Sequence, residues 1–265
     1  MTGSEYGEFE FQMHYNQNIN TRGYIDMDDQ NQTMLPIGEI VEDVGPIQAP
    51  ALKEYSGEFV TLAPVDPERD VDELFLNSHG SETKEQIWTY MAYGPFPSRD
   101  DMLEWLQSCK ASTNMNFFTV KSRELGQCVG MLSILNVIAQ MRTLELGNIW
   151  YSTIVHHTKI NTEAVYLMLK EIFNEQYFRR VEWKCDALNA RSRNAALRLG
   201  FSFEGIFKQH YIIKNRNRDT AWFSMIDKEW PDFKINMKKW LYTDQRYTSL
   251  SAINESLLDP TCKAI

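Results

Sequence analysis

The sequence has no apolar run long enough to cross a membrane. No window of about 18 residues is continuously apolar, and the first ten residues, MTGSEYGEFE, contain neither a basic start nor an apolar stretch. We therefore expect neither a membrane span nor a secretory signal. The expected location is intracellular and cytoplasmic, with a nuclear location also left open.

Residues that bind metals or form disulfides are scarce. The cysteines lie far apart, without a C-x-x-C pair: Cys109, Cys128, Cys185 and Cys262. A disulfide framework and a structural zinc site are therefore not expected. His156 and His157 lack a third ligand at a recognisable spacing, so we expect no metal site.

Positive charge is almost absent from the N-terminal part of the chain. Of the net charge of −9, residues 1–45 contribute nine acidic groups against Arg22 alone. Their polar composition, interrupted by Pro36, Pro46 and Pro50, is typical of an extended arm. We expect an acidic arm over residues 1–50, one folded domain over 51–245 and a tail over 246–265.

Basic residues are concentrated in one later segment. Residues 179–218 contain ten Lys or Arg against three acidic residues. The aromatic residues there, such as Trp183 and Phe201, fall at core spacing and do not form a stacking surface. A nucleic-acid partner is therefore not expected, and an anion of another kind is favoured.

The remaining pattern predicts alternating strands and helices. A strand–helix–strand unit within a mostly antiparallel meander implies an α/β (α+β) fold: a mixed, mostly antiparallel central sheet flanked by helices, in a single domain. The expected strands are 59–62, 117–121, 127–136, 142–152, 181–188, 201–213 and 220–227, and the expected helices are 67–76, 98–109, 162–178, 192–199 and 231–241.

Two local features of this pattern bear on function. We expect Ser192 to cap the short helix that ends at Gly200, with Arg193 and Arg198 facing outward. The last two strands should form a hairpin around residues 214–219.

Several motifs together carry a resemblance over roughly residues 55–245. They are Gly57, Val60, Leu62 and Pro64; Val129-Gly130; Leu144-Glu145-Leu146-Gly147; Thr162-Glu163-Ala164; and Asn189, Ser192 and Ala195, followed by Arg198-Leu199-Gly200-Phe201. This combination resembles the GNAT superfamily of acyl-CoA-dependent N-acetyltransferases, particularly the group with the ribosomal-protein alanine N-acetyltransferases.

The resemblance implies an acyltransferase that moves an acetyl group from acetyl-CoA to a primary amine by direct attack in a ternary complex. The acceptor, a small molecule or a peptide or protein N-terminus, and the oligomeric state stay open. The alternative is a non-catalytic binding or regulatory module with the same fold. An assay that offers a panel of amines with acetyl-CoA and detects the released thiol distinguishes the enzyme from the binding module.

One loop departs from the superfamily pattern. The cofactor pyrophosphate lies in that superfamily on a Q/R-x-x-G-x-G/A loop at the start of the long helix. The corresponding residues here are 156–161, with Lys159 and Asn161 in place of small residues. By resemblance the phosphate end would be held by Thr158, Lys159, Ile160, Asn161 and Thr162, with a charged donor from Lys159, a hydroxyl from Thr158 and a helix cap from Asn161.

Acyl transfer to an amine needs a base, because an alkyl amine is mostly cationic at neutral pH. Glu145 is the first candidate, since it lies on the polar face of the strand that borders the cofactor in similar enzymes. It could equally be a solvated carboxylate or one paired with Arg142. Glu182 and Asp186 are weaker candidates.

The resemblance also assigns the remaining cofactor contacts. Asn189 would bond the pantetheine arm, Ser192 would protonate the leaving thiolate, and Arg191 and Arg193, together with Arg198, would face the phosphates. The structural alternative for Asn189 and Ser192 is helix capping, and for the arginines it is a solvated basic face. Tyr211 is a second candidate proton donor. The pantetheine arm would pair with the backbone of Ile149, Trp150, Tyr151 and Ser152. A backbone N–H there would polarise the thioester carbonyl.

Overall fold

The computed structural model describes residues 35–243, 249–255 and 257. The chain divides into two units, residues 1–43 and 44–265. In the first unit only residues 35–43 are described, and these form no helix or strand. The sheet and the helices all belong to the second unit, and the domain limits expected from the sequence stay a prediction.

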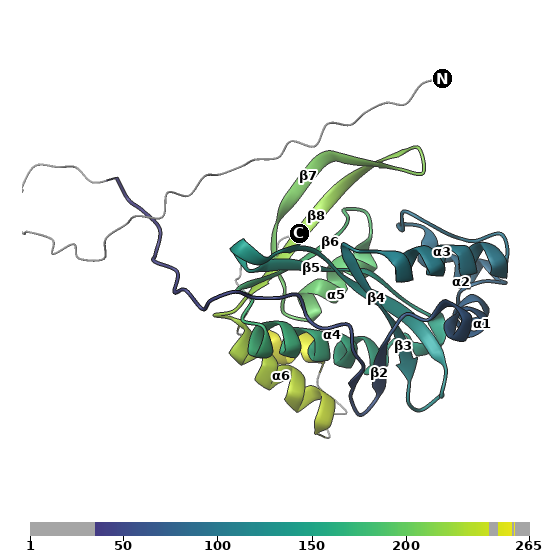
Figure 1. Cartoon of the computed structure of the whole chain (residues 1–265), viewed down its shortest axis with the longest axis horizontal. Helices are drawn as coiled ribbons and strands as arrows, with labels where there is room; N and C mark the ends of the chain where they lie inside the picture. Colours follow the sequence, from purple (N-terminus) through teal and green to yellow (C-terminus); the bar gives the residue numbers. More distant parts are fainter. Residues whose placement is uncertain (1–34, 244–248, 256, 258–265) are drawn as a thin grey trace, which may run out of the picture. The chain divides into compact units, whose positions relative to one another are not determined.

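Eight strands form one sheet in the order β1-β2-β3-β4-β5-β6-β8-β7 (Figure 1). Every neighbouring pair is antiparallel except β5 and β6, which are parallel. The expected mixed, mostly antiparallel sheet is therefore confirmed. The strands are β1 (Tyr55–Ser56), β2 (Val60–Pro64), β3 (Met115–Ser122), β4 (Cys128–Ile138), β5 (Thr143–Tyr151), β6 (Arg180–Asp186), β7 (Ser202–Ile213) and β8 (Arg216–Ile226).

Helices cover both faces of this sheet, and α4 and α6 lie side by side (Figure 1). The helices are α1 (Pro67–Ser78), α2 (Glu82–Glu85), α3 (Arg99–Ala111), α4 (Ile160–Lys170), α5 (Ala190–Arg198), α6 (Trp230–Tyr242) and α7 (Leu250–Asn254). Ser98 caps α3 through its hydroxyl, which accepts the N–H of Asp101, as its position in the sequence predicts.

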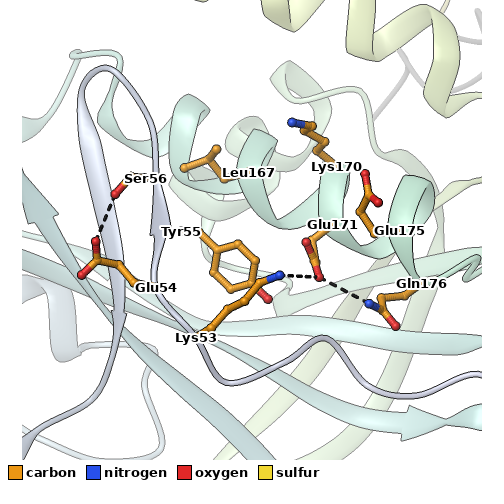
Figure 2. Close-up of a pocket in the computed structure, with 9 residues that line it drawn as sticks. All are labelled: Lys53, Glu54, Tyr55, Ser56, Leu167, Lys170, Glu171, Glu175 and Gln176. Atoms are coloured by element: carbon orange, nitrogen blue, oxygen red, sulfur yellow. Dashed lines mark hydrogen bonds and ion pairs between the residues drawn. The ribbon is translucent and has the colours of Figure 1, made fainter.

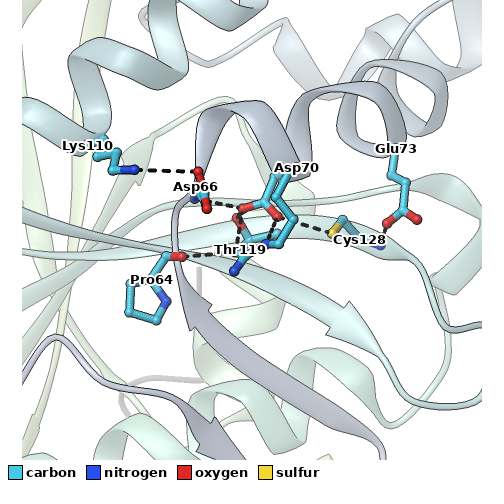
Figure 3. Close-up of polar contacts among 8 residues, drawn as sticks. Pro64, Asp66, Asp70, Glu73, Lys110, Thr119 and Cys128 are labelled. Atoms are coloured by element: carbon cyan, nitrogen blue, oxygen red, sulfur yellow. Dashed lines mark hydrogen bonds and ion pairs between the residues drawn. The ribbon is translucent and has the colours of Figure 1, made fainter.

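Two hydrophobic cores fill the space between sheet and helices. Phe118 points into the core beneath α4 and α6, whereas the adjacent Phe117 points into the core beneath α1 and α3. This is the alternation that a strand buried on both faces requires. Figure 3 shows how α1 is fixed: the buried Asp70 accepts the hydroxyl proton of Thr119 on β3 at 2.7 Å and the N–H of Asp66 at 2.9 Å.

The pairing of the two parallel strands is short. It covers three residue pairs and ends at Glu145 with Glu182, although β5 continues to Tyr151 and β6 to Asp186. Beyond Glu182, β6 remains paired with β8, while β5 remains paired with β4. We call residues 146–151 of β5 and 183–186 of β6 the fork. The β5 backbone there has a β-strand partner on one side only.

Two expected elements differ in the structure. The helix expected over 162–178 ends at Lys170 and continues as a wider π-turn over Glu171–Glu175, because tertiary packing overrides its continuous apolar periodicity. The six-residue hairpin loop expected over 214–219 is a two-residue turn. Lys214 and Asn215 both adopt positive φ, 50° and 60°, as a two-residue hairpin turn of this hand requires.

Candidate functional site

A bulge and a glycine shape the β5 side of the fork. Met131 pairs with Trp150 and Ser133 with Gly147, so β5 has one residue more than β4 between these pairs. Asn148, within the bulge, has a φ of 52°. Gly130 of β4 lies against this segment, and a Cβ there would be 2.2 Å from the carbonyl oxygen of Trp150. Only glycine therefore allows β4 to follow β5 this closely.

Glu145 lies at the point where the fork opens. It is buried rather than solvated, and its partners are Lys184 and Asn136 rather than Arg142, a pairing that the sequence left open. Its Oε2 accepts from Lys184 Nζ at 2.9 Å and from Asn136 Nδ2 at 2.7 Å. Glu145 Oε1 faces Gly147, where a Cβ would lie 3.5 Å away. One carboxylate oxygen is thus fixed, and the other faces the start of the fork.

Lys184 joins several groups on the polar face of the sheet. Its ammonium also contacts Glu182 at 2.8 Å and lies 3.9 Å from the centre of the Trp222 ring. Burial alone would lower the pKa of Lys184, but the hydrogen bonds to Glu182 and Glu145 raise it overall. Glu182 is further paired with Arg180 at 3.0 Å. Sequence spacing gave no signal for the Lys184–Glu145 pair, because the two residues meet only when the strands pair.

The residue that caps α5 is Asn189, not Ser192. Asn189 Oδ1 accepts the N–H of Ser192 at 3.1 Å, which leaves the Asn189 amide group to donate elsewhere. The helix begins at Ala190, one turn earlier than expected, because Asn189 already provides the cap. Ser192 Oγ instead accepts the indole N–H of Trp183 at 3.0 Å. The Ser192 hydroxyl keeps its own proton, and its hydrogen bond with Cys185 partly offsets the rise that burial causes in the pKa of that thiol.

The loop before α4 has a different arrangement from the one expected. Lys159 occupies the N-cap position, but its ammonium donates to the carbonyl of Leu241 and lies over the Phe59 ring at 4.7 Å. The Thr158 hydroxyl is bonded to the carbonyl of Val155 at 2.7 Å. Asn161 lies inside the first turn and does not cap the helix. In this structure the charge of Lys159 therefore points toward α6.

The arginines of α5 lie in different environments. Arg191 is exposed, and Arg193 donates to the carbonyl of Ala187 at 3.1 Å. Arg198, expected to face outward, is partly buried and donates to Thr162 Oγ1, in the first turn of α4, at 2.7 Å. Burial lowers the pKa of Arg198. A cation at a helix N-terminus opposes the helix dipole, so this corner favours an anion.

Four polar atoms near the fork have no hydrogen-bond partner in the part of the chain that the structure describes. They are Trp150 Nε1, Tyr151 Oη, Ser152 Oγ and Asn161 Oδ1, and all four are buried. Burial also raises the pKa of Tyr151. Each unpaired buried atom costs about 1–3 kcal/mol. Groups of this kind fit a polar ligand that lies along the end of β5 and reaches the start of α4.

The opposite side of the fork is closed by contacts between distant segments. Lys214, at the tip of the β7–β8 hairpin, donates to the carbonyls of Trp88, at 2.9 Å, and of Gly94. Tyr93, in the same loop, donates its hydroxyl proton to Asn148 Oδ1 at 3.2 Å. The tip of the β7–β8 hairpin and the segment from Trp88 to Gly94 are therefore in contact. Tyr93 and Asn148 were not identified from the sequence, since no motif marks them.

A separate hollow of about 540 Å³ lies near the C-terminal end of α4 (Figure 2). Its lining includes Lys53 and Glu171, which form an ion pair at 3.4 Å, and Tyr55. With a rise of 1.5 Å per residue, the ten steps from Ile160 to Lys170 place this end of α4 about 15 Å from its start. The hollow thus contains none of the residues of the fork.

Within residues 35–243, 249–255 and 257, no helix is both long enough and apolar enough to span a membrane. Among the same residues, no three or more His, Cys, Asp or Glu side chains come together in a way that could hold a metal ion.

Comparison with known families identifies one match. Residues 60–202 match a family model described as an acetyltransferase (GNAT) domain. A search of curated proteins found no match to the chain.

Solved structures give similar results. A GCN5-related N-acetyltransferase from Brucella melitensis is 34% identical with a TM-score of 0.74, over 79% of this chain and 96% of that one. A probable GNAT-family acetyltransferase from Chromobacterium violaceum is 33% identical with a TM-score of 0.68, over 76% and 100%. The microcin C7 self-immunity acetyltransferase MccE, solved with acetyl-CoA and AMP, is 20% identical with a TM-score of 0.56, over 64% and 93%, and shows the fold alone.

Proposed function

The chain belongs to the GNAT family of acetyltransferases and is therefore an acyltransferase, and we propose that it transfers an acetyl group from acetyl-CoA to a primary amine by direct attack in a ternary complex. The observation that carries this proposal is the fork. The pairing of β5 with β6 stops at Glu145 and Glu182, and unpaired buried polar atoms lie directly beyond it.

The residues at the fork fit acetyl-CoA as cosubstrate. The backbone of Ile149, Trp150, Tyr151 and Ser152 would pair with the pantetheine arm like an added strand, and an N–H there would polarise the thioester carbonyl. Bound acetyl-CoA supplies the activated acyl group. The free amide of Asn189 would donate to the arm.

The phosphate end would lie at the first turn of α4. The backbone N–H groups of Thr158, Lys159, Ile160, Asn161 and Thr162 and the helix dipole favour an anion there. Arg191 and Arg193 would add positive charge from α5. The Lys159 side chain, bonded to Leu241, would contribute only after a change of rotamer.

Two side chains would move protons. Glu145 would accept the proton of the attacking amine, directly or through a water molecule, at the oxygen that faces Gly147. Ser192 would give its hydroxyl proton to the departing thiolate, since its oxygen already accepts from Trp183. A cytoplasmic location, and the absence of nucleic-acid and membrane partners, stay predictions.

An amine panel with detection of the released thiol tests the proposal. We expect thiol release to depend on at least one amine, with kcat reduced about 10²-fold or more in Glu145→Gln. Ser192→Ala should also lower kcat, while the exposed Ser108→Ala should not. If acetyl-CoA binds but no amine in a broad panel releases thiol, catalysis is refuted and a binding module is favoured.

A further inference from the structure

The polar face of the sheet continues beyond Lys184 onto the β7–β8 hairpin. Arg218, Thr220 and Trp222 alternate along β8, so their side chains lie on one face. Trp222 is paired with Lys184 of β6, and Thr220 with Asp186. We call Arg218, Thr220 and Trp222, together with His210 of β7, the hairpin face.

Each residue of the hairpin face has a buried polar atom without a hydrogen-bond partner. The atoms are Arg218 Nε, Thr220 Oγ1, Trp222 Nε1 and His210 Nδ1. In the described part of the chain the only other such side-chain atoms are the four at the fork. The unpaired atoms therefore form two groups, one where we place the cosubstrate and one on the hairpin face. Donors predominate in the second group, which indicates a ligand rich in acceptor oxygens.

A second bulge fixes the position of His210. Phe207 pairs with Thr220 and Tyr211 with Arg218, so three residues of β7 bulge out between the two pairs. Gln209 has a φ of 51°, and its N–H donates to Asp219 Oδ1 at 2.7 Å. The His210 ring thereby lies 3.9 Å from the Tyr211 ring and 6.1 Å from that of Trp222. The bulge thus directs a ring nitrogen toward the same face.

Arg218 gives the hairpin face a positive charge, and the nearby carboxylate of Asp186, which is paired with Thr220, accepts the N–H of Leu188 at 2.8 Å. Arg218 lies over the Tyr211 ring at 5.5 Å and forms no ion pair with any residue that the structure describes. The carboxylates nearest the fork are already engaged, because Glu145 and Glu182 both bind Lys184. A polycationic acceptor would be repelled here, whereas an oxyanion would gain charge-assisted hydrogen bonds from the guanidinium.

Resting on the proposed function, we propose that the acceptor is an amine that also carries an oxyanion, a carboxylate or a phosphate, and that Arg218 holds this oxyanion. Thr220, Trp222 and His210 supply further hydrogen bonds. Lys184 connects the two ends, since its ammonium contacts both Glu145 and the Trp222 ring. Arg218 is four residues from Trp222, about 13 Å along a strand. The oxyanion is therefore several bonds away from the amine.

Four amines with six carbons each test this proposal: 6-aminohexanoate, 6-aminohexyl phosphate, 6-aminohexanol and 1,6-diaminohexane. Calorimetry is carried out on the full chain with CoA present. We expect the carboxylate or the phosphate to bind about tenfold or more tightly than the alcohol, and the diamine most weakly, because charge-assisted hydrogen bonds are among the stronger ones. The carboxylate-to-phosphate ratio identifies the oxyanion.

Two variants localise the effect. Arg218→Met should bring the affinity for the acid down to that for the alcohol and leave CoA binding unchanged. Arg216→Met, an exposed arginine on the same strand, should keep the preference. The proposal is overturned if the four amines do not differ, if the diamine binds best, or if Arg218→Met weakens all four alike. Thiol release is measured separately: if the acid binds but releases no thiol, transfer to this amine is refuted and the recognition of its oxyanion is upheld.

Discussion

Glu163, in the first turn of α4, carries a buried carboxylate with four hydrogen bonds. It accepts the N–H groups of Glu58, Phe59 and Val60, at 2.8, 2.6 and 2.8 Å, and the hydroxyl proton of Tyr242 at 2.8 Å. A Cβ at Gly57 would lie 2.3 Å from the carboxyl carbon. One side chain thus connects β2, α4 and α6. The motif residues Gly57 and Glu163, which contribute to the family resemblance, therefore have a structural role.

Replacing this carboxylate should destabilise the fold. Glu163→Gln points an amide N–H₂ group at backbone donors, and we expect the free energy of unfolding to fall by about 2 to 4 kcal/mol. The exposed Glu58→Gln is the matched control and should change stability by less than about 0.5 kcal/mol. Urea denaturation measures both. A Glu163→Gln protein as stable as the control would show that the hydrogen bonds contribute nothing net.

His156 should report on the phosphate end of the site. Burial lowers its pKa; the Tyr151 carbonyl raises it, while the charges of Arg191 and His157 lower it further. The folded protein therefore favours neutral imidazole. This contribution to stability is fully present above the ordinary pKa of about 6.5 and is lost as the pH falls below that value and through the lowered pKa of the folded protein. A phosphate nearby would stabilise the charged form and raise this pKa.

Cosubstrate binding near pH 6 should then take up a proton. We expect calorimetric enthalpies for acetyl-CoA to differ between two buffers of unequal ionisation enthalpy, and affinity to increase as the pH is lowered from 8 to 6. His156→Asn should abolish the difference, whereas His210→Asn should not. Identical enthalpies in both buffers would place the phosphates away from His156.

At the scale of elements, the β7–β8 hairpin contacts a segment that is distant in the sequence. Its tip is attached to the loop before α3 by Lys214, which donates to the carbonyls of Trp88 and Gly94. Lys214→Met should loosen this attachment and raise KM for the amine about tenfold, with KM for acetyl-CoA unchanged. Lys208→Met, an exposed residue of β7, serves as control. Steady-state kinetics with each substrate varied in turn would contradict this role if both KM values changed together.

The sequence predicted the elements better than it predicted their ends and partners. Periodicity identified the sheet and the large helices, because burial on one or two faces imposes it. The run Lys214-Asn215-Arg216-Asn217-Arg218-Asp219 was interpreted as a loop because it is entirely polar, yet Arg216–Asp219 belongs to β8 and alternates between faces. The sequence predicted Ser192 and not Asn189 as the N-cap of α5, because both are good capping residues.

The partners of the candidate site residues depend on the tertiary fold and have no local signal. Lys184 reaches Glu145 across the single parallel strand pair. Arg198 turns inward because Thr162, 36 residues earlier, lies beside it. Only the assembled sheet and helices bring these groups together, so sequence spacing could not foresee them.

At the scale of the whole molecule, two hydrophobic cores hold the sheet from both sides while its centre remains partly unpaired. Strand β5 is bonded to β4 along its length but to β6 only over Thr143–Glu145. The fork thus lies between rigidly packed elements, as a site that must hold reacting groups in place requires. The hollow of Figure 2, at the other end of α4, has no comparable set of unpaired groups among the described residues.

Hydrogen exchange with mass spectrometry, with and without CoA, tests most directly whether the cosubstrate lies at the fork. We predict that saturating CoA slows amide exchange over residues 149–162 and 189–193, because the ligand covers the end of β5 and the first turns of α4 and α5. Exchange over residues 53–56 and 167–176, which line the hollow, should not change. Slower exchange at the hollow without slower exchange at the fork would contradict the account.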